Sequence, residues 1–181
     1  MLNRRILKLA LPNIFTNITI PLLAMVDLGL MGHMGSEKYV GAVAVGGMIF
    51  SFLFWAFGFL RMGTSGFTAQ AFGKRNLAET GNILLRASVV AFGVGLLLIA
   101  LQWPLGWLAF SLVDGSAAVE TLARQYFAIR IYAAPPTLFL YVLTGWFIGM
   151  QNARLPMILA ISVNLLNVLL SLAFIKWLDW G

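Results

Sequence analysis

The sequence contains no cysteine and a single histidine, and only six of its 181 residues are Asp or Glu. Without cysteine there is no disulfide framework, no thiolate nucleophile and no Cys-ligated metal site. Few side chains remain that could hold another metal, and no nucleophile–base constellation stands out. The sequence therefore argues against an enzyme and against a resident cofactor.

Charged residues are also scarce, at 10% of the chain, whereas 61% of the residues are hydrophobic. An average soluble domain has roughly a quarter charged residues, so this composition indicates an integral membrane protein. The formal charge of +6 does not indicate nucleic-acid binding, because the Lys and Arg residues punctuate apolar segments instead of clustering on a polar face. We expect membrane lipid, and no nucleic acid, around this chain.

The apolar residues form long runs. A helix needs about 20 apolar residues to cross a hydrocarbon core of about 30 Å. The chain divides into five such segments, which predict an all-α, polytopic membrane helix bundle with about five transmembrane helices. The predicted spans are residues 9–32, 41–72, 83–103, 126–149 and 156–178. The stretch "LVDGSAAVETLARQ" at 112–125 is predicted to be a linker.

The basic residues predict the orientation of these spans. If the N-terminus is cytoplasmic, seven Lys and Arg residues lie inside (Arg4, Arg5, Lys8, Lys74, Arg75, Arg86 and Arg154) and four lie outside (Lys38, Arg124, Arg130 and Lys176). This excess favours a multi-pass protein with a cytoplasmic N-terminus, which we expect in the inner (plasma) membrane. Pro12 and Asn13 interrupt the first apolar run, so we expect an uncleaved span and not a signal peptide.

The first predicted span carries a carboxylate, Asp27, in the stretch "MVDLGLMGHMG". An unpaired charge at the bilayer centre costs about 2.5–3.5 kcal/mol, and somewhat less in the outer half where Asp27 is expected. Asn13, Thr16 and Asn17 fall within about a quarter turn of the face that carries it. We predict that this polar stripe lines a cavity in which Asp27 is a cation or proton site. The alternative is that Asp27 pairs with a nearby Arg or hydroxyl and fixes helix packing.

The last predicted span contains a second polar row. Asn164, Asn167 and Ser171 are spaced i, i+3 and i+7, which places them on one face of a helix. Two interpretations remain open. The row either forms hydrogen bonds between helices, worth about 0.6–2 kcal/mol each, or faces the same cavity as Asp27 and helps to coordinate a small cation or a protonated group.

Three pairs of small residues are predicted to let helix backbones approach closely. These pairs are Gly145 with Gly149, Ala42 with Gly46, and Ala91 with Gly95. The stretch "RMGTSGFTAQAFGKRN" is less apolar, and its polar residues (Thr64, Ser65, Thr68 and Gln70) are expected at a water-accessible inner mouth. We expect Arg61, Arg86 and Arg130 to snorkel or to pair with other groups and not to bind substrate.

Several stretches resemble, in the same order, the multidrug and toxic compound extrusion (MATE) family, most closely its DinF-like branch. They are "LALPNIFTNITIPLLAMVDLGLMGHMG", "FLRMGTSGFTAQAFGKRN" and "IRIYAAPPTLFLYVLTGWFIGMQNARLPMILAISVNLLNVLLS". The resemblance implies a secondary antiporter that exports small organic, often cationic, compounds against an inward flow of Na⁺ or H⁺. The coupling ion would be the only small inorganic ligand, held at Asp27.

The resemblance also assigns residues. Asp27 matches the acid that is the central coupling residue of the family, and Asn167 matches an Asn that contributes to the same site. Such proteins often carry a second Asp one turn later, where this sequence has Ser171. That difference removes one charge from the implied site.

Members of this family have twelve spans in two six-helix lobes. Residues 1–181 are therefore expected to form a partial N-terminal lobe, completed by a C-terminal lobe or by another chain. Two alternatives remain open. The chain could be a truncated or pairing membrane subunit that does not transport, or a flippase for lipid-linked precursors from the same superfamily.

Overall fold

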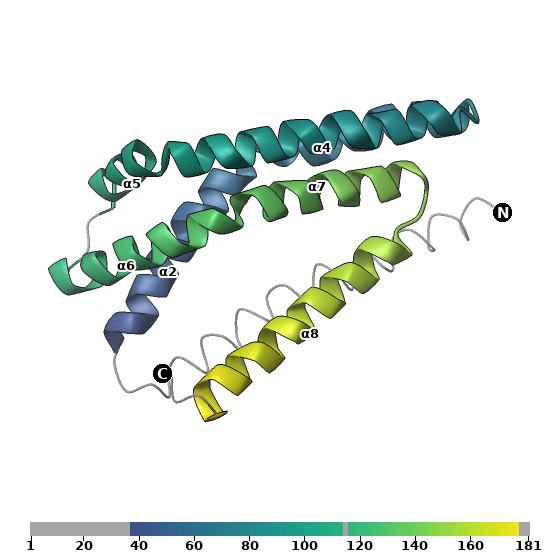
Figure 1. Cartoon of the computed structure of the whole chain (residues 1–181). Helices are drawn as coiled ribbons and strands as arrows, with labels where there is room; N and C mark the ends of the chain where they lie inside the picture. Colours follow the sequence, from purple (N-terminus) through teal and green to yellow (C-terminus); the bar gives the residue numbers. More distant parts are fainter. Residues whose placement is uncertain (1–36, 114–115, 178–181) are drawn as a thin grey trace. The chain divides into compact units, whose positions relative to one another are not determined.

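The computed structural model describes residues 37–113 and 116–177, and every regular element in these ranges is helical (Figure 1). The prediction of an all-α chain is confirmed for this part. The helices are α2 (Glu37–Trp55), α3 (Gly58–Gly73), α4 (Leu77–Ala100), α5 (Gln102–Ser111), α6 (Ala117–Arg130), the 3₁₀ turn η1 (Ile131–Ala133), α7 (Ala134–Gly149) and α8 (Arg154–Trp177).

Residues 37–150 form one compact unit, and α8 belongs to another, so the two are described separately. Four segments of the described residues are long and apolar enough to cross a membrane: Lys38–Gly73, Leu77–Ala100, Ala117–Gly149 and Arg154–Ser171. They correspond to four of the five predicted spans and support a multi-pass membrane protein. The remaining predicted span, 9–32, lies outside the described residues.

The second predicted span, 41–72, is not one continuous helix. At 1.5 Å per residue, the 36 residues of Lys38–Gly73 would measure about 54 Å as a straight helix, well beyond the hydrocarbon core. The helix breaks at Ala56–Phe57, where the Phe57 N–H donates to the Phe54 carbonyl oxygen at 3.0 Å, a tighter i to i−3 bond. Gly58 follows at the start of α3, and glycine is a common site of such breaks.

Most of the predicted linker at 112–125 is helical in the structure, because α6 begins at Ala117. The preceding helix, α5, ends at Ser111. Ala, Leu, Glu and Arg in "AAVETLARQ" are good helix formers even though the stretch is only weakly apolar. Glu120 and Arg124 form an i, i+4 ion pair of 2.8 Å that adds to this helix. Hydropathy alone therefore places the start of the span, at 126, nine residues too late.

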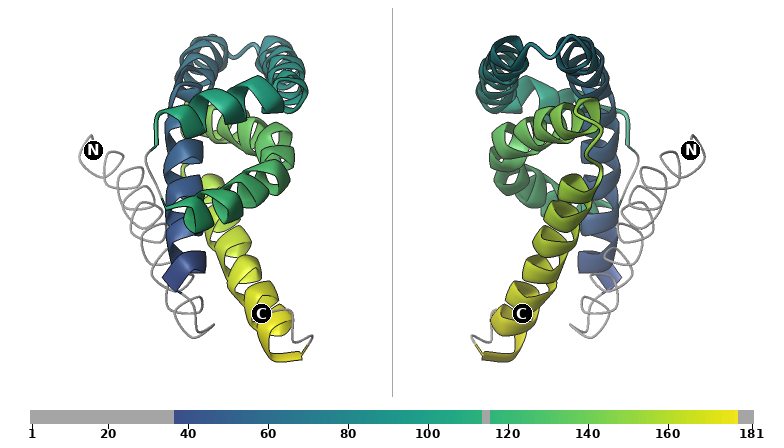
Figure 2. Two further views of the ribbon diagram at one scale, coloured as in Figure 1. Left: turned by 90° about the vertical axis from the view of Figure 1, so that its left-hand side faces the viewer. Right: turned by 90° about the vertical axis from the view of Figure 1, so that its right-hand side faces the viewer.

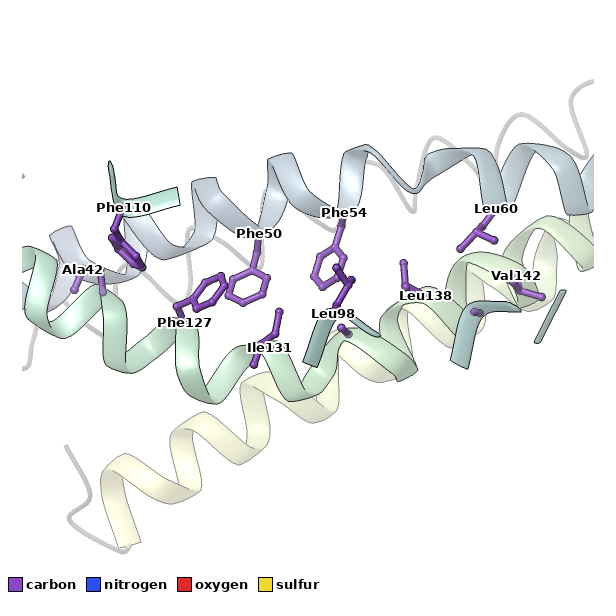
Figure 3. Packing of buried hydrophobic residues seen from close by; sticks show 13 residues of the cluster. Ala42, Phe50, Phe54, Leu60, Leu98, Phe110, Phe127, Ile131, Leu138 and Val142 are labelled. Carbon is purple, nitrogen blue, oxygen red and sulfur yellow. The ribbon is translucent and has the colours of Figure 1, made fainter. Parts of the chain in front are cut away.

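Helix α7 is the centre of the larger unit. It packs against α3 and α4, and its neighbour α6 packs against α2 (Figure 2). The rings of Phe50 in α2 and Phe127 in α6 stack with centroids 5.1 Å apart, and Phe110 of α5 meets Phe127 edge to face (Figure 3). Ile131 of η1 and Leu138 and Val142 of α7 are fully buried and continue this cluster.

The small residues lie where helices meet most closely, as predicted. A Cβ atom on Gly149 would be 2.6 Å from the Thr68 Cβ and 2.7 Å from the Ser65 carbonyl oxygen. A Cβ atom on Gly145 would overlap the carbonyl oxygen of Arg61. The other two pairs behave alike, since Gly95 faces the backbone of Pro135 and Gly46 faces the ring of Tyr126.

Candidate functional site

The polar row of the last span lies on α8, whose start is well defined. The Asn152 side-chain oxygen accepts from the N–H groups of Arg154 and Leu155, at 3.2 and 3.3 Å. An Asn that receives the first N–H groups of a helix is a typical N-cap, and Pro156 is tolerated in the first turn because it lacks an N–H to satisfy. The helix then continues without a break to Trp177.

Asn164, Asn167 and Ser171 all fall within this continuous helix, so their spacing does place them along one face. They differ in burial, because Asn164 and Ser171 are half-buried whereas Asn167 is exposed. The half-buried positions of α8 recur every three or four residues at Met157, Ala160, Asn164, Val168 and Ser171. Two members of the polar row thus lie on this partly covered stripe, and Asn167 lies beside it.

The amide nitrogen of Asn164 is the most notable group on α8. This Nδ2 atom is buried, and among the described residues it has no hydrogen-bond partner. Burying an amide donor without a partner is unfavourable by roughly 1–3 kcal/mol, so such a position favours a partner that accepts a hydrogen bond, such as a carboxylate. Amide and hydroxyl oxygens on the same face suit a small hard cation, but α8 carries no carboxylate that could balance its charge.

The other predicted site residues are Asn13, Thr16, Asn17 and Asp27, and all four lie outside the described residues. Within residues 37–113 and 116–177, no group of three or more His, Cys, Asp or Glu side chains lies close enough together to hold a metal ion.

A groove of about 640 Å³ runs between α3 and α4 in the larger unit. Thr64 and Gln70, expected at a water-accessible mouth, do line it. Thr68, expected at the same mouth, instead packs against Gly149, and its buried hydroxyl has no hydrogen-bond partner among the described residues. The residues expected at one polar mouth are thus divided between the groove and the interface of α3 with α7.

The arginines expected to pair largely do so. Arg86 forms an ion pair of 3.3 Å with Glu79, at the groove. Arg130 donates to the Tyr126 hydroxyl and lies 5.4 Å above the centroid of the Phe50 ring. Arg61 is exposed. The groove itself was not predicted, although Glu79, Ile83, Arg86 and Val90 recur at helical spacing and could have indicated a shared face.

A comparison with protein families decides the identity of the chain. The MatE family model matches residues 12–173. The chain belongs to the MatE family. The resemblance found in the sequence is thereby confirmed, and the matched range includes every candidate site residue from Asn13 to Ser171.

Individual relatives of this MatE chain agree with the family match. DNA damage-inducible protein F of Escherichia coli strain K12 is 45% identical over 173 residues, which cover 96% of this chain and 37% of that protein. This similarity supports the DinF-like branch. Multidrug and toxin extrusion protein 1 of Oryctolagus cuniculus is 29% identical, covering 98% of this chain and 31% of the relative.

A solved structure shares the fold of this MatE chain. It is a MOP superfamily transporter from Pyrococcus furiosus, with a TM-score of 0.87 and 20% sequence identity. The match covers 98% of this chain and 39% of the archaeal one. The chain thus spans between about a third and two fifths of the length of these relatives.

Proposed function

We propose that the chain forms most of the N-terminal lobe of an antiporter that exports small organic, often cationic, compounds against an inward flow of Na⁺ or H⁺. The observation that carries this proposal is the MatE family match, which runs from residue 12 to residue 173 and so contains both predicted polar rows. A second lobe, from the same or another polypeptide, completes the transporter. Alternating access needs two lobes that move against each other around a site at the middle of the membrane.

In this proposal Asp27 carries the exchangeable charge. It is the acid of the first polar row, and a carboxylate in a membrane-embedded site binds either a proton or a small cation to reduce its cost in low dielectric. Asn164 and Asn167 contribute amide groups from α8, whose Asn164 Nδ2 lacks a partner among the described residues. Asn13, Thr16 and Asn17 line the cavity beside Asp27.

With Ser171 in place of a second Asp, the proposed site has one negative charge fewer than a site with two carboxylates. A hydroxyl oxygen can be a ligand for Na⁺, but it neither balances charge nor releases a proton at neutral pH. With one acid, the proposed site neutralises one positive charge at a time. Coupling ion and organic cation then compete for Asp27, and alternating access between the two lobes converts this competition into exchange.

The proposed location is the inner (plasma) membrane with the N-terminus in the cytoplasm. The support is the distribution of the twelve Lys and Arg residues, seven of which lie on the inside with this orientation. The loop after α3, with Lys74 and Arg75, then faces the cytoplasm.

A chimera tests the proposal. The N-terminal portion of the Escherichia coli relative, which is 45% identical, is replaced by this chain and the protein is produced in cells depleted of their own exporters. The parent relative, the chimera and the chimera with Asp27→Asn are compared for accumulation of a cationic dye under imposed Na⁺ and pH gradients. We expect dye export by the chimera and a severe loss of export in Asp27→Asn.

Membrane insertion is measured in parallel, by the amount of each protein in the membrane fraction. The expected result is equal insertion of all three proteins, since an Asn is easier to insert than an Asp. If the parent exports dye and Asp27→Asn changes neither dye export by the chimera nor its dependence on the gradients, Asp27 is not the coupling residue and the proposal fails.

A further inference from the structure

The groove between α3 and α4 is polar at one end and apolar at the other. The two helices lie side by side and are joined by the turn at residues 74–76 (Figure 2). Four polar lining residues, Gln70, Lys74, Asn76 and Glu79, lie close to this turn, and Arg86 reaches back from within α4 to Glu79. Thr64 is the remaining polar lining residue among those described, and it lies farther along α3. The apolar ones extend away from it and include Phe59, Leu60, Phe67, Ile83 and Val90.

The dimensions of the groove match one leaflet of a bilayer. From Asn76 to Val90 the helix rises about 20 Å, whereas half of the hydrocarbon core measures about 15 Å. The apolar lining residues span about 11 Å of α4, from Ile83 to Val90, and about 12 Å of α3, from Phe59 to Phe67. This length fits part of an acyl chain within one leaflet, and the turn, about 20 Å from Val90, lies at head-group depth. The volume of about 640 Å³ is within the range of small-molecule sites, roughly 300–1,000 Å³.

Cationic groups outnumber acidic ones at the polar end. Within the described part of the chain, Glu79 is the single acid that lines the groove, against the two basic residues Lys74 and Arg86. Among the described residues Lys74 forms no ion pair, and Arg86 uses one N–H group of its guanidinium on Glu79. Both members of that pair remain accessible, with 73% and 40% of their side chains exposed. Donors therefore remain for an anionic partner.

The position of Arg86 fits a head-group contact. It lies more than two turns inside α4, but its partner Glu79 is nearer the turn, so its side chain extends toward the polar end of the groove. Long basic side chains commonly reach the membrane surface in this way. A basic pocket between membrane helices is an arrangement that binds anionic head groups.

We propose that this groove binds an anionic phospholipid, with the head group at Lys74, Asn76 and Arg86 and one acyl chain along Phe67, Ile83 and Val90. An organic cation does not match the positive excess, and a soluble anion leaves the apolar walls uncovered. An anionic amphiphile matches both ends. None of these lining residues belongs to the proposed coupling site, and the proposal does not depend on transport.

Native mass spectrometry of the purified full chain in detergent tests the proposal. Dioleoylphosphatidylglycerol and dioleoylphosphatidylcholine are added separately, because they share their acyl chains and differ in charge. We expect the anionic lipid to remain bound preferentially. The double variant Lys74→Gln/Arg86→Gln should reduce this preference by roughly tenfold or more, since each basic residue contributes to the attraction.

The matched control is Lys38→Gln/Arg154→Gln, which also removes two exposed cations but neither of those that line the groove. Circular dichroism and size-exclusion profiles verify that each variant keeps its helices. Equal loss of preference in both double variants would show general charge attraction and would overturn the proposal. Unchanged preference in Lys74→Gln/Arg86→Gln would overturn it as well.

A second pair of variants tests the acyl chain. Val90→Trp places a large ring in the groove, whereas Val89→Trp changes the neighbouring, exposed residue that does not line it. We expect less bound phosphatidylglycerol in Val90→Trp alone. If both Trp variants bind as much lipid as the original chain, the apolar groove is not occupied by lipid and the proposal fails.

Discussion

Trp146 of α7 donates its indole N–H to the backbone carbonyl oxygen of Thr80 in α4, across a distance of 2.9 Å. The two residues are 66 positions apart in the sequence, so this hydrogen bond connects two membrane segments. Thr80 is itself buried, and its hydroxyl donates to the Asn76 carbonyl oxygen at 2.8 Å. The contact therefore ties α7 to the first turn of α4.

Trp146→Phe should destabilise the larger unit modestly. The substitution keeps an aromatic ring beside Phe147 but removes the donor to Thr80. A net loss of about 0.5–1.5 kcal/mol in the free energy of unfolding is expected for one such hydrogen bond. Unfolding in mixed micelles, followed by circular dichroism, measures this difference.

Trp103→Phe is the control for this prediction, because it makes the same chemical change in a side chain that is 84% exposed. It should leave the free energy of unfolding within error of the original. Equal losses in the two variants would mean that the measurement reports general loss of indole area and not the bond between α4 and α7.

Gly145→Ala and Gly149→Ala should each loosen the contact between α3 and α7. The new methyl group meets the Arg61 carbonyl oxygen in one case and Thr68 and Ser65 in the other. Overpacking of this kind costs about 1–3 kcal/mol, while the better helix propensity of Ala returns at most about 1 kcal/mol. We expect a net loss of unfolding free energy, measured as for Trp146→Phe.

Gly66→Ala provides the comparison, since a Cβ atom there meets nothing within 4 Å. That variant gains helix propensity without a clash and should be as stable as the original or slightly more stable. A Gly149→Ala protein that is also as stable as the original would contradict the close approach of Thr68 in α3 to Gly149 in α7.

The sequence predicts the membrane segments better than their ends. Long apolar runs are required by the thickness of the bilayer, so hydropathy detects them directly. Helix ends depend on other forces. Asn76 begins α4 by accepting from the Glu79 N–H at 3.0 Å, and this cap lies in a polar stretch that hydropathy assigns to a loop. At Ala117, where α6 begins, Ser116 makes no such side-chain hydrogen bond, and the start follows instead from the good helix formers of residues 117–125.

Contacts between helices follow from the sequence only where small residues mark them. Gly145 and Gly149 could be predicted to face another helix, because their spacing has a direct steric meaning. The groove could not, since it depends on which residues of α3 oppose Glu79 and Arg86 of α4. The spacing of Asn164 and Ser171 predicts their common helical face but not the groups that cover it.

Ser171→Asp should strengthen cation binding if the proposed coupling site is correct. A second carboxylate near Asp27 creates two like charges that are relieved by a bound cation. We expect Na⁺ affinity to rise about tenfold or more, which corresponds to about 1.4 kcal/mol. Equilibrium binding of radioactive sodium to the chimera with the Escherichia coli relative measures the change.

Ser162→Asp is a matched control for that experiment. Positions 162 and 171 are nine residues apart, which places them on opposite faces of α8, and Ser162 is exposed. The control should leave Na⁺ affinity unchanged. No difference between the two Asp variants would indicate that Ser171 does not face the proposed site.

The chain by itself should enter membranes but should not transport. Insertion depends mainly on the hydrophobicity of single helices, and four described segments meet that requirement. Alternating access needs a second lobe, and this chain covers 37% of the Escherichia coli relative. Residues 1–181 are reconstituted in proteoliposomes, and uptake of a cationic dye is measured under imposed Na⁺ and pH gradients, with protein-free liposomes as the control. We expect no gradient-driven uptake above that control. Robust uptake that disappears in Asp27→Asn would contradict this expectation, because it would mean that copies of this chain assemble into a complete transporter.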